Sequence, residues 1–336
     1  MITSAAVLGA GAWGTALAAH LARRSDLAVT LWARDTNAAR SIETSRVNAR
    51  YLPGVALPAA LNVTAELSAV AGAALLIVAT PVAALPEVAR SLHALGARAP
   101  LVWLSKGFLV TSGDDARPGV ALPHQVLASW WPAPVGVVSG PSFAEEVARG
   151  LPTAVAVAAT TPEVAAQVAQ LLRAETLRAY VSDDLAGVEV GGAVKNVLAI
   201  AAGASDGLGF GHNARAALIT RGLAETGRLS TALGGRRETL MGLTGLGDLV
   251  LTCTGDLSRN RRVGLGLAVG KPLQAILDEL GHVAEGVGAA QAVRLLARHH
   301  GIDMPICDAV HRVLYENLSP RQAVGELLRR EPRQEN

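Results

Sequence analysis

The first apolar residues of the chain predict a strand, a helix and a second strand. Residues 4–8 form a short apolar run, apolar residues recur with helical spacing over 12–24, and a further apolar run follows at 28–32. Residues 1–21 carry no formal charge, but they lack a basic flank and are interrupted by glycines. We therefore expect a βαβ unit here, and neither a signal peptide nor a membrane span.

Later apolar runs extend this pattern, and then it changes. Runs at 74–79, 101–104, 135–138 and 154–158 predict further strands in βα alternation, which is typical of a doubly wound sheet. Beyond about residue 184 the pattern becomes helical, at 188–203, 213–233, 284–300, 306–316 and 319–330. The predicted fold class is α/β, with a doubly wound N-terminal domain (1–184), an all-helical C-terminal domain (185–330) and a polar tail (331–336). We expect the active site in the cleft between the domains.

Composition restricts the class of ligand. The chain has 336 residues, 50% of them hydrophobic and 17% charged, with a net charge of +2 and scattered arginines. This balance predicts a packed globular protein that binds neither nucleic acid nor a membrane surface. Two cysteines, Cys253 and Cys307, are too few for a disulfide framework or a cysteine metal site, which is typical of an intracellular protein. A small-molecule substrate is therefore expected, and no metal.

The turn after the first strand reads Gly9-Ala10-Gly11-Ala12-Trp13-Gly14. In a GxGxxG loop between strand and helix, the glycines allow a tight turn, close approach of a pyrophosphate and close packing of the helix on the strand. The helix N-terminus then offers free amide groups to the phosphates. The pattern alone is weak in a glycine-rich chain, but its position between a strand and a helix favours a dinucleotide site.

Arg34 and Asp35 follow the second strand, where such domains choose their cofactor. An NAD-specific domain usually carries an acidic residue here for the ribose 2′-hydroxyl, whereas an arginine suits the 2′-phosphate of NADP. Asp35 is one position late for that role and is equally well explained as the N-cap of a helix through 38–44. We therefore predict that NADP is the preferred cofactor and that NAD is accepted more weakly.

Only three of the 30 cationic residues are lysines, Lys106, Lys195 and Lys271. Arginine cannot lose its proton in a protein, whereas lysine can exchange one, so each lysine is a candidate for chemistry. Lys271 stands in a turn-like Gly-Lys-Pro and is expected at the surface. Lys106 follows a predicted strand, in Ser-Lys-Gly, where doubly wound sheets bind ligands; Thr80-Pro81 and Gly140-Pro141-Ser142 also follow strands.

Lys195 and Asn196 interrupt an apolar helix in GGAVKN, where an unpaired charge is costly. The alternative is a lysine that extends its head to solvent. Further polar signatures follow in GLGD (245–248), Thr252 and SRNRR (258–262). Arginine and asparagine side chains offer forked donors to phosphate, so SRNRR is interpreted either as an anion clamp or as a solvated helix start.

Together these motifs resemble bacterial NAD(P)-dependent glycerol-3-phosphate dehydrogenase over nearly the whole chain. The resemblance rests on GAGAWGTALA (9–18), SKG (105–107), SGPSFAEE (139–146), GGAVKN (191–196), GLGDLVLTCT (245–254) and SRNRR (258–262). It implies reversible hydride transfer between a nicotinamide cofactor and the pair dihydroxyacetone phosphate and sn-glycerol 3-phosphate, for phospholipid synthesis. It also implies a cytoplasmic homodimer with a Rossmann-like N-terminal domain and a helical C-terminal domain.

The resemblance implies roles for individual residues. Lys195 would be the general acid and base, because the carbonyl oxygen must be protonated as hydride arrives. Lys106 would contact cofactor and substrate, and Asp248 would align Lys195 or accept a substrate hydroxyl, with Asn196 and Thr252 completing this polar set. The substrate would also meet Gly140, Ser142, Ser258, Arg259 and Asn260, the last three at its phosphate. The cofactor would also meet Ala144, Arg259, Val283 and Glu285.

Two departures from the family and two other functions remain. Ala12 replaces a common serine, which removes a possible contact to the pyrophosphate, and 111–119 has the composition of a long polar surface loop. A hydroxyacid or ketoacid reductase would share the lysine but bind a carboxylate, against which the SRN cluster argues. A catalytically silent dinucleotide sensor would have no need of Lys195, Asp248 and Arg259 together.

Overall fold

The computed structural model describes residues 2–112, 118–281 and 283–330, which form two compact units. Unit 1 comprises Met1–Leu109 and Ala121–Glu189, and unit 2 comprises Val110–Val120 and Val190–Asn336. The division falls after Glu189, inside one helix, where the apolar pattern had placed it after residue 184. The predicted polar tail, 331–336, lies outside the described residues.

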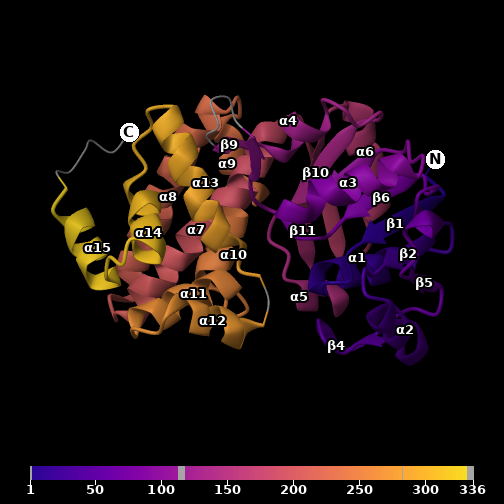
Figure 1. Ribbon diagram of the computed structural model, residues 1–336, viewed down its shortest axis with the longest axis horizontal. Coiled ribbons are helices and arrows are strands. Elements are labelled where there is room, and N and C mark those ends of the chain that lie inside the picture. The colour runs from indigo at the N-terminus through magenta and orange to yellow at the C-terminus, as the bar shows by residue number, and fades with distance from the viewer. Residues whose placement is uncertain (1, 113–117, 282, 331–336) are drawn as a thin grey trace. The chain divides into compact units, whose positions relative to one another are not determined.

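Unit 1 is built on an eight-stranded sheet in the order β12-β11-β10-β7-β6-β1-β2-β5 (Figure 1). The six strands predicted from apolar runs are all present, with ends that differ by a residue at most. The edge strands β5 and β12 were not predicted, because exposed positions interrupt their apolar pattern. The bounds are β1 Ser4–Leu8, β2 Ala28–Trp32, β5 Leu61–Thr64, β6 Leu75–Val78, β7 Leu101–Trp103, β10 Val135–Ser139, β11 Thr153–Ala159 and β12 Leu177–Ser182.

One pair of strands breaks the parallel order of this doubly wound sheet. β10 and β11 run antiparallel, whereas every other pair is parallel. The connection between them holds only a short helix, Ala144–Ala148, and does not cross the sheet, so the chain re-enters at the edge where it left. Apolar composition alone could not reveal this reversal.

Helices cover both faces of the sheet, and each face has its own apolar core. Leu17 and Val168 belong to one core, and Trp103 and Leu92 belong to the other, all of them at most 1% exposed. The helices are α1 Ala12–Leu21, α2 Thr36–Ser45, α3 Leu85–Ala94, α4 Pro123–Leu127, α5 Ala144–Ala148 and α6 Pro162–Leu172. A small pair of strands, β3 Val47–Asn48 and β4 Leu52–Ala56, and the 3-10 turns Leu67–Val70 and Val82–Ala84 complete unit 1.

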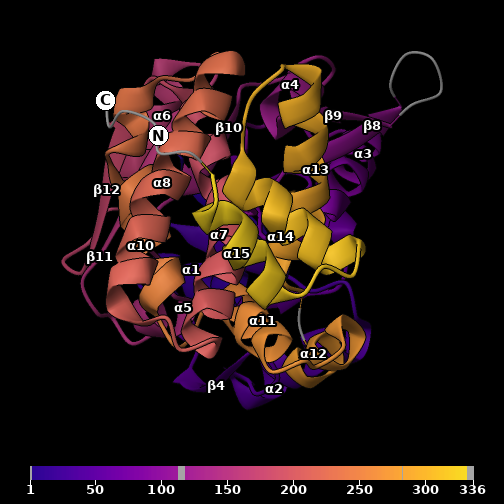
Figure 2. The ribbon, with the colours of Figure 1, turned by 90° about the vertical axis from the view of Figure 1, so that its left-hand side faces the viewer.

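Unit 2 is a set of helices, and Figure 2 shows α13, α14 and α15 packed side by side. The five predicted helical stretches are confirmed, whereas α9 to α12 are shorter and were not predicted. The helices are α7 Leu185–Gly207, which begins in unit 1, α8 Gly211–Ala232, α9 Arg237–Leu240, α10 Asp248–Thr254, α11 Arg259–Ala268, α12 Leu273–Leu280, α13 Glu285–His299, α14 Pro305–Tyr315 and α15 Pro320–Leu328.

Two segments need separate comment. By length and composition α7 is apolar enough to cross a membrane, but 89% of its most apolar window is buried, as in the core helix of a soluble protein. The predicted polar loop 111–119 begins and ends in the paired strands β8 Leu109–Ser112 and β9 Pro118–Ala121. Its central residues, 113–117, lie outside the described part of the chain.

Candidate active site

The glycine loop of unit 1 has the geometry that the motif predicts. Gly9 has φ +121°, and a Cβ there would lie 2.9 Å from the carbonyl carbon of Ala79. A Cβ on Gly14 would lie 2.0 Å from the carbonyl oxygen of Gly9, so the helix packs directly on the turn. Gly11 faces open space and caps α1 without a side-chain hydrogen bond. The first amide groups of α1 therefore fit a pyrophosphate, and Ala12 and Trp13 lie in this first turn.

The carboxyl end of β2 distinguishes the two explanations of Asp35. The Asp35 carboxylate accepts a hydrogen bond of 2.7 Å from the backbone N–H of Ala38 and caps α2. The N-cap interpretation is therefore confirmed. Arg34 is exposed beside it. Its contact with a 2′-phosphate stays a prediction.

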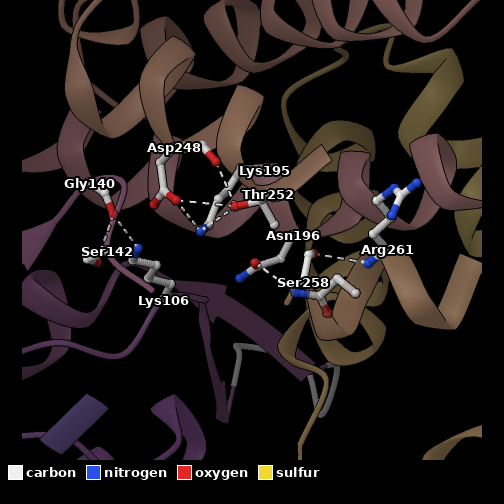
Figure 3. Close-up of polar contacts among 10 residues, drawn as sticks. Lys106, Gly140, Ser142, Lys195, Asn196, Asp248, Thr252, Ser258 and Arg261 are labelled. Carbon is white, nitrogen blue, oxygen red and sulfur yellow. Dashed lines mark hydrogen bonds and ion pairs between the residues drawn. The ribbon is translucent and has the colours of Figure 1, made fainter. Parts of the chain in front are cut away.

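Lys106 lies at the same edge of the sheet, after β7. Its Nζ donates a hydrogen bond of 3.0 Å to the carbonyl oxygen of Gly140, and the hydroxyl of Ser142 donates to the same oxygen at 3.0 Å (Figure 3). Gly140 has φ +137°, and a Cβ there would lie 3.1 Å from the Cα of Val155. The structure therefore brings together three predicted substrate residues of unit 1, around a carbonyl that only a glycine presents so easily.

A row of buried hydroxyls crosses the same edge. Thr80, Ser105 and Ser139 each stand two residues beyond a paired row of β6, β7 and β10. Their oxygen atoms are buried without a hydrogen-bond partner among the described residues. Such groups are normally satisfied by water or by a ligand. Thr80 and Ser105 were predicted to face a ligand, whereas Ser139 was missed and could have been found by extending the strand register.

Lys195 occupies the centre of the polar cluster in unit 2. The residue is 8% exposed, so the interpretation of a lysine that extends to solvent is wrong. Its Nζ donates to Asp248 Oδ1 at 2.5 Å and to the hydroxyl of Thr252 at 2.9 Å (Figure 3). The Thr252 hydroxyl donates in turn to the backbone carbonyl of Asp248 at 2.6 Å. The carboxylate compensates the buried ammonium, which would otherwise be too costly to desolvate.

Close packing explains the glycines around this cluster. A Cβ on Gly245 would lie 2.0 Å from the carbonyl oxygen of Leu240, and one on Gly191 would lie 2.8 Å from that of Thr244. Gly245 lies in the π-helical turn Leu243–Gly247, directly before α10. The turn places Asp248 at the start of α10, with Thr252 one turn later on the same face.

Two asparagines join α7 to α11. Asn260 Nδ2 donates to Asn196 Oδ1 at 2.9 Å, and Asn260 Oδ1 accepts from the backbone N–H of Gly286 at 3.0 Å. The Nδ2 of Asn196 is buried without a partner among the described residues, and it points away from Asn260 (Figure 3). It is therefore a donor available to a ligand.

SRNRR begins a helix, as one of its two interpretations predicted. Ser258 caps α11 by accepting a hydrogen bond of 3.2 Å from the backbone N–H of Arg261. Arg259 is exposed in the first turn, and whether it holds an anion stays a prediction. Among the other predicted cofactor residues, Ala144 and Glu285 begin α5 and α13, and Val283 is 54% exposed.

The two outstanding structural predictions about cations and metals have different outcomes. Lys271 is exposed and forms an ion pair of 2.8 Å with Glu279, as its turn-like sequence indicated. Within the ranges that the structure describes, no three histidine, cysteine or acidic side chains gather as metal ligands. Cys253 and Cys307 are buried as free thiols.

Comparison with known proteins places the chain in a family. Residues 4–165 match the profile of the NAD-dependent glycerol-3-phosphate dehydrogenase N-terminus, and residues 184–325 match that of its C-terminus. The chain belongs to this family. The prediction made from the motifs is thereby confirmed, and a hydroxyacid or ketoacid reductase is disfavoured.

Individual relatives agree with this assignment. The chain is 55% identical over 334 residues to a glycerol-3-phosphate dehydrogenase [NAD(P)+] of Aromatoleum aromaticum, covering 98% of this chain and 99% of the relative. It is 54% identical to the protein of the same name from Dechloromonas aromatica, covering 98% of each. The crystal structure of glycerol-3-phosphate dehydrogenase from Coxiella burnetii is 44% identical, with a TM-score of 0.91, and the match covers 98% of this chain and 99% of that one. NAD and NADP both fit these names.

Proposed function

We propose that the chain catalyses the reversible reduction of dihydroxyacetone phosphate to sn-glycerol 3-phosphate by NADPH or NADH. The observation that carries this proposal is the buried cluster of Lys195, Asp248 and Thr252, in a chain of the glycerol-3-phosphate dehydrogenase family. A catalytically silent sensor would have no use for a desolvated lysine with two oriented partners. We further propose that the enzyme works in the cytoplasm and supplies phospholipid synthesis.

The proton step belongs to Lys195. A nicotinamide bound at the glycine loop would supply the hydride, and the pyrophosphate would be held by the first amide groups of α1. As the carbonyl oxygen of the substrate gains negative charge, Nζ of Lys195 gives it a proton, and in the reverse direction Nζ accepts one. Asp248 and Thr252 hold Nζ in one orientation, so no reorientation is needed during the reaction.

The other side chains bind and orient the substrate. Lys106, fixed by its hydrogen bond to Gly140, polarises the carbonyl oxygen as a positive charge. The buried Nδ2 of Asn196 donates to a substrate hydroxyl. Ser258, Arg259 and Asn260 bind the phosphate at the start of α11, where an exposed arginine and the helix N-terminus both favour an anion.

The deciding experiment is the oxidation of NADPH followed by absorbance, with one substrate at a time. Dihydroxyacetone phosphate should be reduced efficiently, unphosphorylated dihydroxyacetone poorly, and 2-keto acids not at all. Reduction of a 2-keto acid in place of the phosphorylated substrate would indicate the reductase function. NADPH binding without turnover on any of the three would indicate a sensor.

The assembly state is a separate proposal. We expect a homodimer, as the family resemblance implies. Sedimentation of the purified protein tests this directly, because a monomer of 34.5 kDa and a dimer of twice that mass differ clearly in sedimentation coefficient. A monomer at working concentrations would exclude the homodimer without affecting the proposed reaction.

A further inference from the structure

An ion-pair network joins three helices of unit 2 close to the proposed phosphate residues. Asp206, near the end of α7, accepts hydrogen bonds from Arg261 Nε at 3.0 Å and from Arg215 Nη1 at 2.9 Å. Arg261 comes from α11 and Arg215 from α8. The side chains of Asp206, Arg261 and Arg215 are 12%, 13% and 18% exposed, so solvent screens these charges only weakly.

Arg261 differs from Arg215 in what its backbone does. The backbone N–H of Arg261 donates to the hydroxyl of Ser258 and so forms the cap of α11, while its guanidinium reaches back to α7. A second guanidinium nitrogen of Arg261 binds Asp256, in the turn before the helix, at 3.0 Å. One residue therefore ties the cap, the preceding turn and α7 together.

The two helices also touch at their backbones beside this ion pair. A Cβ on Gly203 would lie 2.0 Å from the carbonyl oxygen of Arg261, and one on Gly264 would lie 2.0 Å from that of Ile200. With so little space between the axes, α11 has few ways to shift other than sliding or rotating along α7. The Asp206–Arg261 pair and the Asn196–Asn260 bond oppose both movements, because they join neighbouring residues of α11 to separate turns of α7.

We propose that Arg261 is a positioning residue for the substrate phosphate, and that Asp206 is its anchor. By fixing the first turn of α11 against α7, the pair holds Ser258, Arg259 and Asn260 in the geometry that binds the phosphate. Arg261 itself is occupied by two carboxylates and does not bind the phosphate. This inference rests on the proposed function, since it concerns the affinity for the phosphorylated substrate.

The two arginines on Asp206 provide a matched experiment. We expect Arg261→Gln and Asp206→Asn each to raise KM for dihydroxyacetone phosphate about tenfold, with kcat and the KM for NADPH within about twofold of the wild type, because a displaced binding group weakens substrate binding. Arg215→Gln removes a cation at a similar distance from the same carboxylate but lies on α8. It should leave KM for dihydroxyacetone phosphate within about twofold of the wild type.

Each alternative outcome is distinct. If wild-type protein does not reduce dihydroxyacetone phosphate, the proposed function fails before the variants are compared. Given wild-type activity, an equal rise of KM in Arg215→Gln would show a general effect of stability, and an unchanged KM in Arg261→Gln would show that the pair positions nothing. A normal KM in Asp206→Asn with a raised KM in Arg261→Gln would mean that Arg261 binds the phosphate directly. Each of these three results overturns the inference.

Two further measurements separate positioning from folding. The KM for unphosphorylated dihydroxyacetone should not change in either Arg261→Gln or Asp206→Asn, and an equal rise for both substrates would contradict the inference. If Arg261→Gln does not fold, Arg261→Lys keeps the charge without the forked donors and decides the question. That variant should raise KM for dihydroxyacetone phosphate about threefold, and an unchanged KM would overturn the inference.

Discussion

The two lysines proposed for the chemistry are held in different ways, one in each unit. Lys106 follows a strand, is partly exposed and donates to the backbone carbonyl of Gly140. Lys195 lies inside a helix, is 8% exposed and donates to the carboxylate of Asp248 and the hydroxyl of Thr252. A sheet edge thus presents its cation on backbone geometry, whereas the helical unit builds its site from side chains that compensate one another. The first arrangement suits a fixed charge, and the second suits an oriented proton donor.

Removing Lys195 should have the largest effect. We expect Lys195→Met to lower turnover by about 10²- to 10⁴-fold, because general acid–base catalysis contributes a factor of that order. NADPH affinity, measured by fluorescence titration, should stay close to that of the wild type, since the cofactor lies at the glycine loop. Lys271→Met, at an exposed lysine, is the matched control and should be fully active. More than a tenth of wild-type turnover in Lys195→Met would exclude the assigned role.

Removing Lys106 should cost less rate but more cofactor affinity. We expect Lys106→Met to lower kcat/KM for dihydroxyacetone phosphate about 10²-fold, as does the loss of one electrostatic stabiliser of a developing oxyanion. Unlike Lys195→Met, it should also raise the KM for NADPH, because Lys106 is expected to contact both ligands. Steady-state kinetics with each ligand varied in turn would show the difference. Identical kinetic profiles for the two variants would remove the functional distinction between the lysines.

A second buried carboxylate of unit 2, Glu225, shows what happens when backbone groups are the main compensation. Glu225 is 2% exposed and accepts hydrogen bonds from the backbone N–H groups of Ile306 and Cys307. Burial raises the pKa of Glu225 from the ordinary 4.5 to about 7. The folded state therefore keeps a proton that the unfolded chain releases, so this group lowers stability as pH rises from about 4.5 to about 7, with no further loss above.

The size of this effect follows from the shift of the pKa. A shift of this size corresponds to about 3 kcal/mol between pH 4.5 and neutral pH. Thermal unfolding followed by circular dichroism across that range should show a decline in the wild type that is flatter in Glu225→Gln. Glu326→Gln, at a partly exposed carboxylate whose pKa is lowered by Arg312, serves as control and should not flatten the decline. Parallel profiles for wild type and Glu225→Gln would refute the prediction.

The phosphate contact tests whether the exposed arginine of unit 2 functions at all. We expect Arg259→Ala to raise KM for dihydroxyacetone phosphate about tenfold, since hydrogen bonds to charged groups are worth about 1.5–3 kcal/mol. The KM for dihydroxyacetone should change much less. Arg262→Ala, at a second exposed arginine of α11, is the control. Equal effects on both substrates would show that Arg259 is not the phosphate residue.

Cofactor choice in unit 1 should give the smallest effect. We predict that the wild type prefers NADPH, and that Arg34→Ala lowers kcat/KM for NADPH about fivefold while leaving NADH unchanged, since an exposed cation contributes modestly to binding a 2′-phosphate. Arg40→Ala, exposed in α2, is the control. A wild type that already prefers NADH, or a variant that loses both cofactors equally, would contradict this use of Arg34.

The comparison of the units also shows which parts of the site could be predicted. Gly9, Gly11 and Gly14 were found because a strand, a turn and a helix N-terminus are adjacent in sequence. Lys195 was found because a charge in an apolar helix is conspicuous. Its partner Thr252 was proposed only through the family resemblance, and no local pattern indicates that Asp248 and Thr252 lie within hydrogen-bond reach of Nζ.

Periodicity, turn glycines and the rarity of lysine are local properties, so the sequence by itself determined the α/β fold, the dinucleotide loop and the two lysines. Tertiary structure alone decided the reversal of β11, the burial of Lys195 and the docking of Arg261 on Asp206. Each of these depends on which distant segments meet, and on whether a charge finds its partner once water is removed. Spacing along the chain carries no direct record of such meetings, because packing of the whole unit selects them.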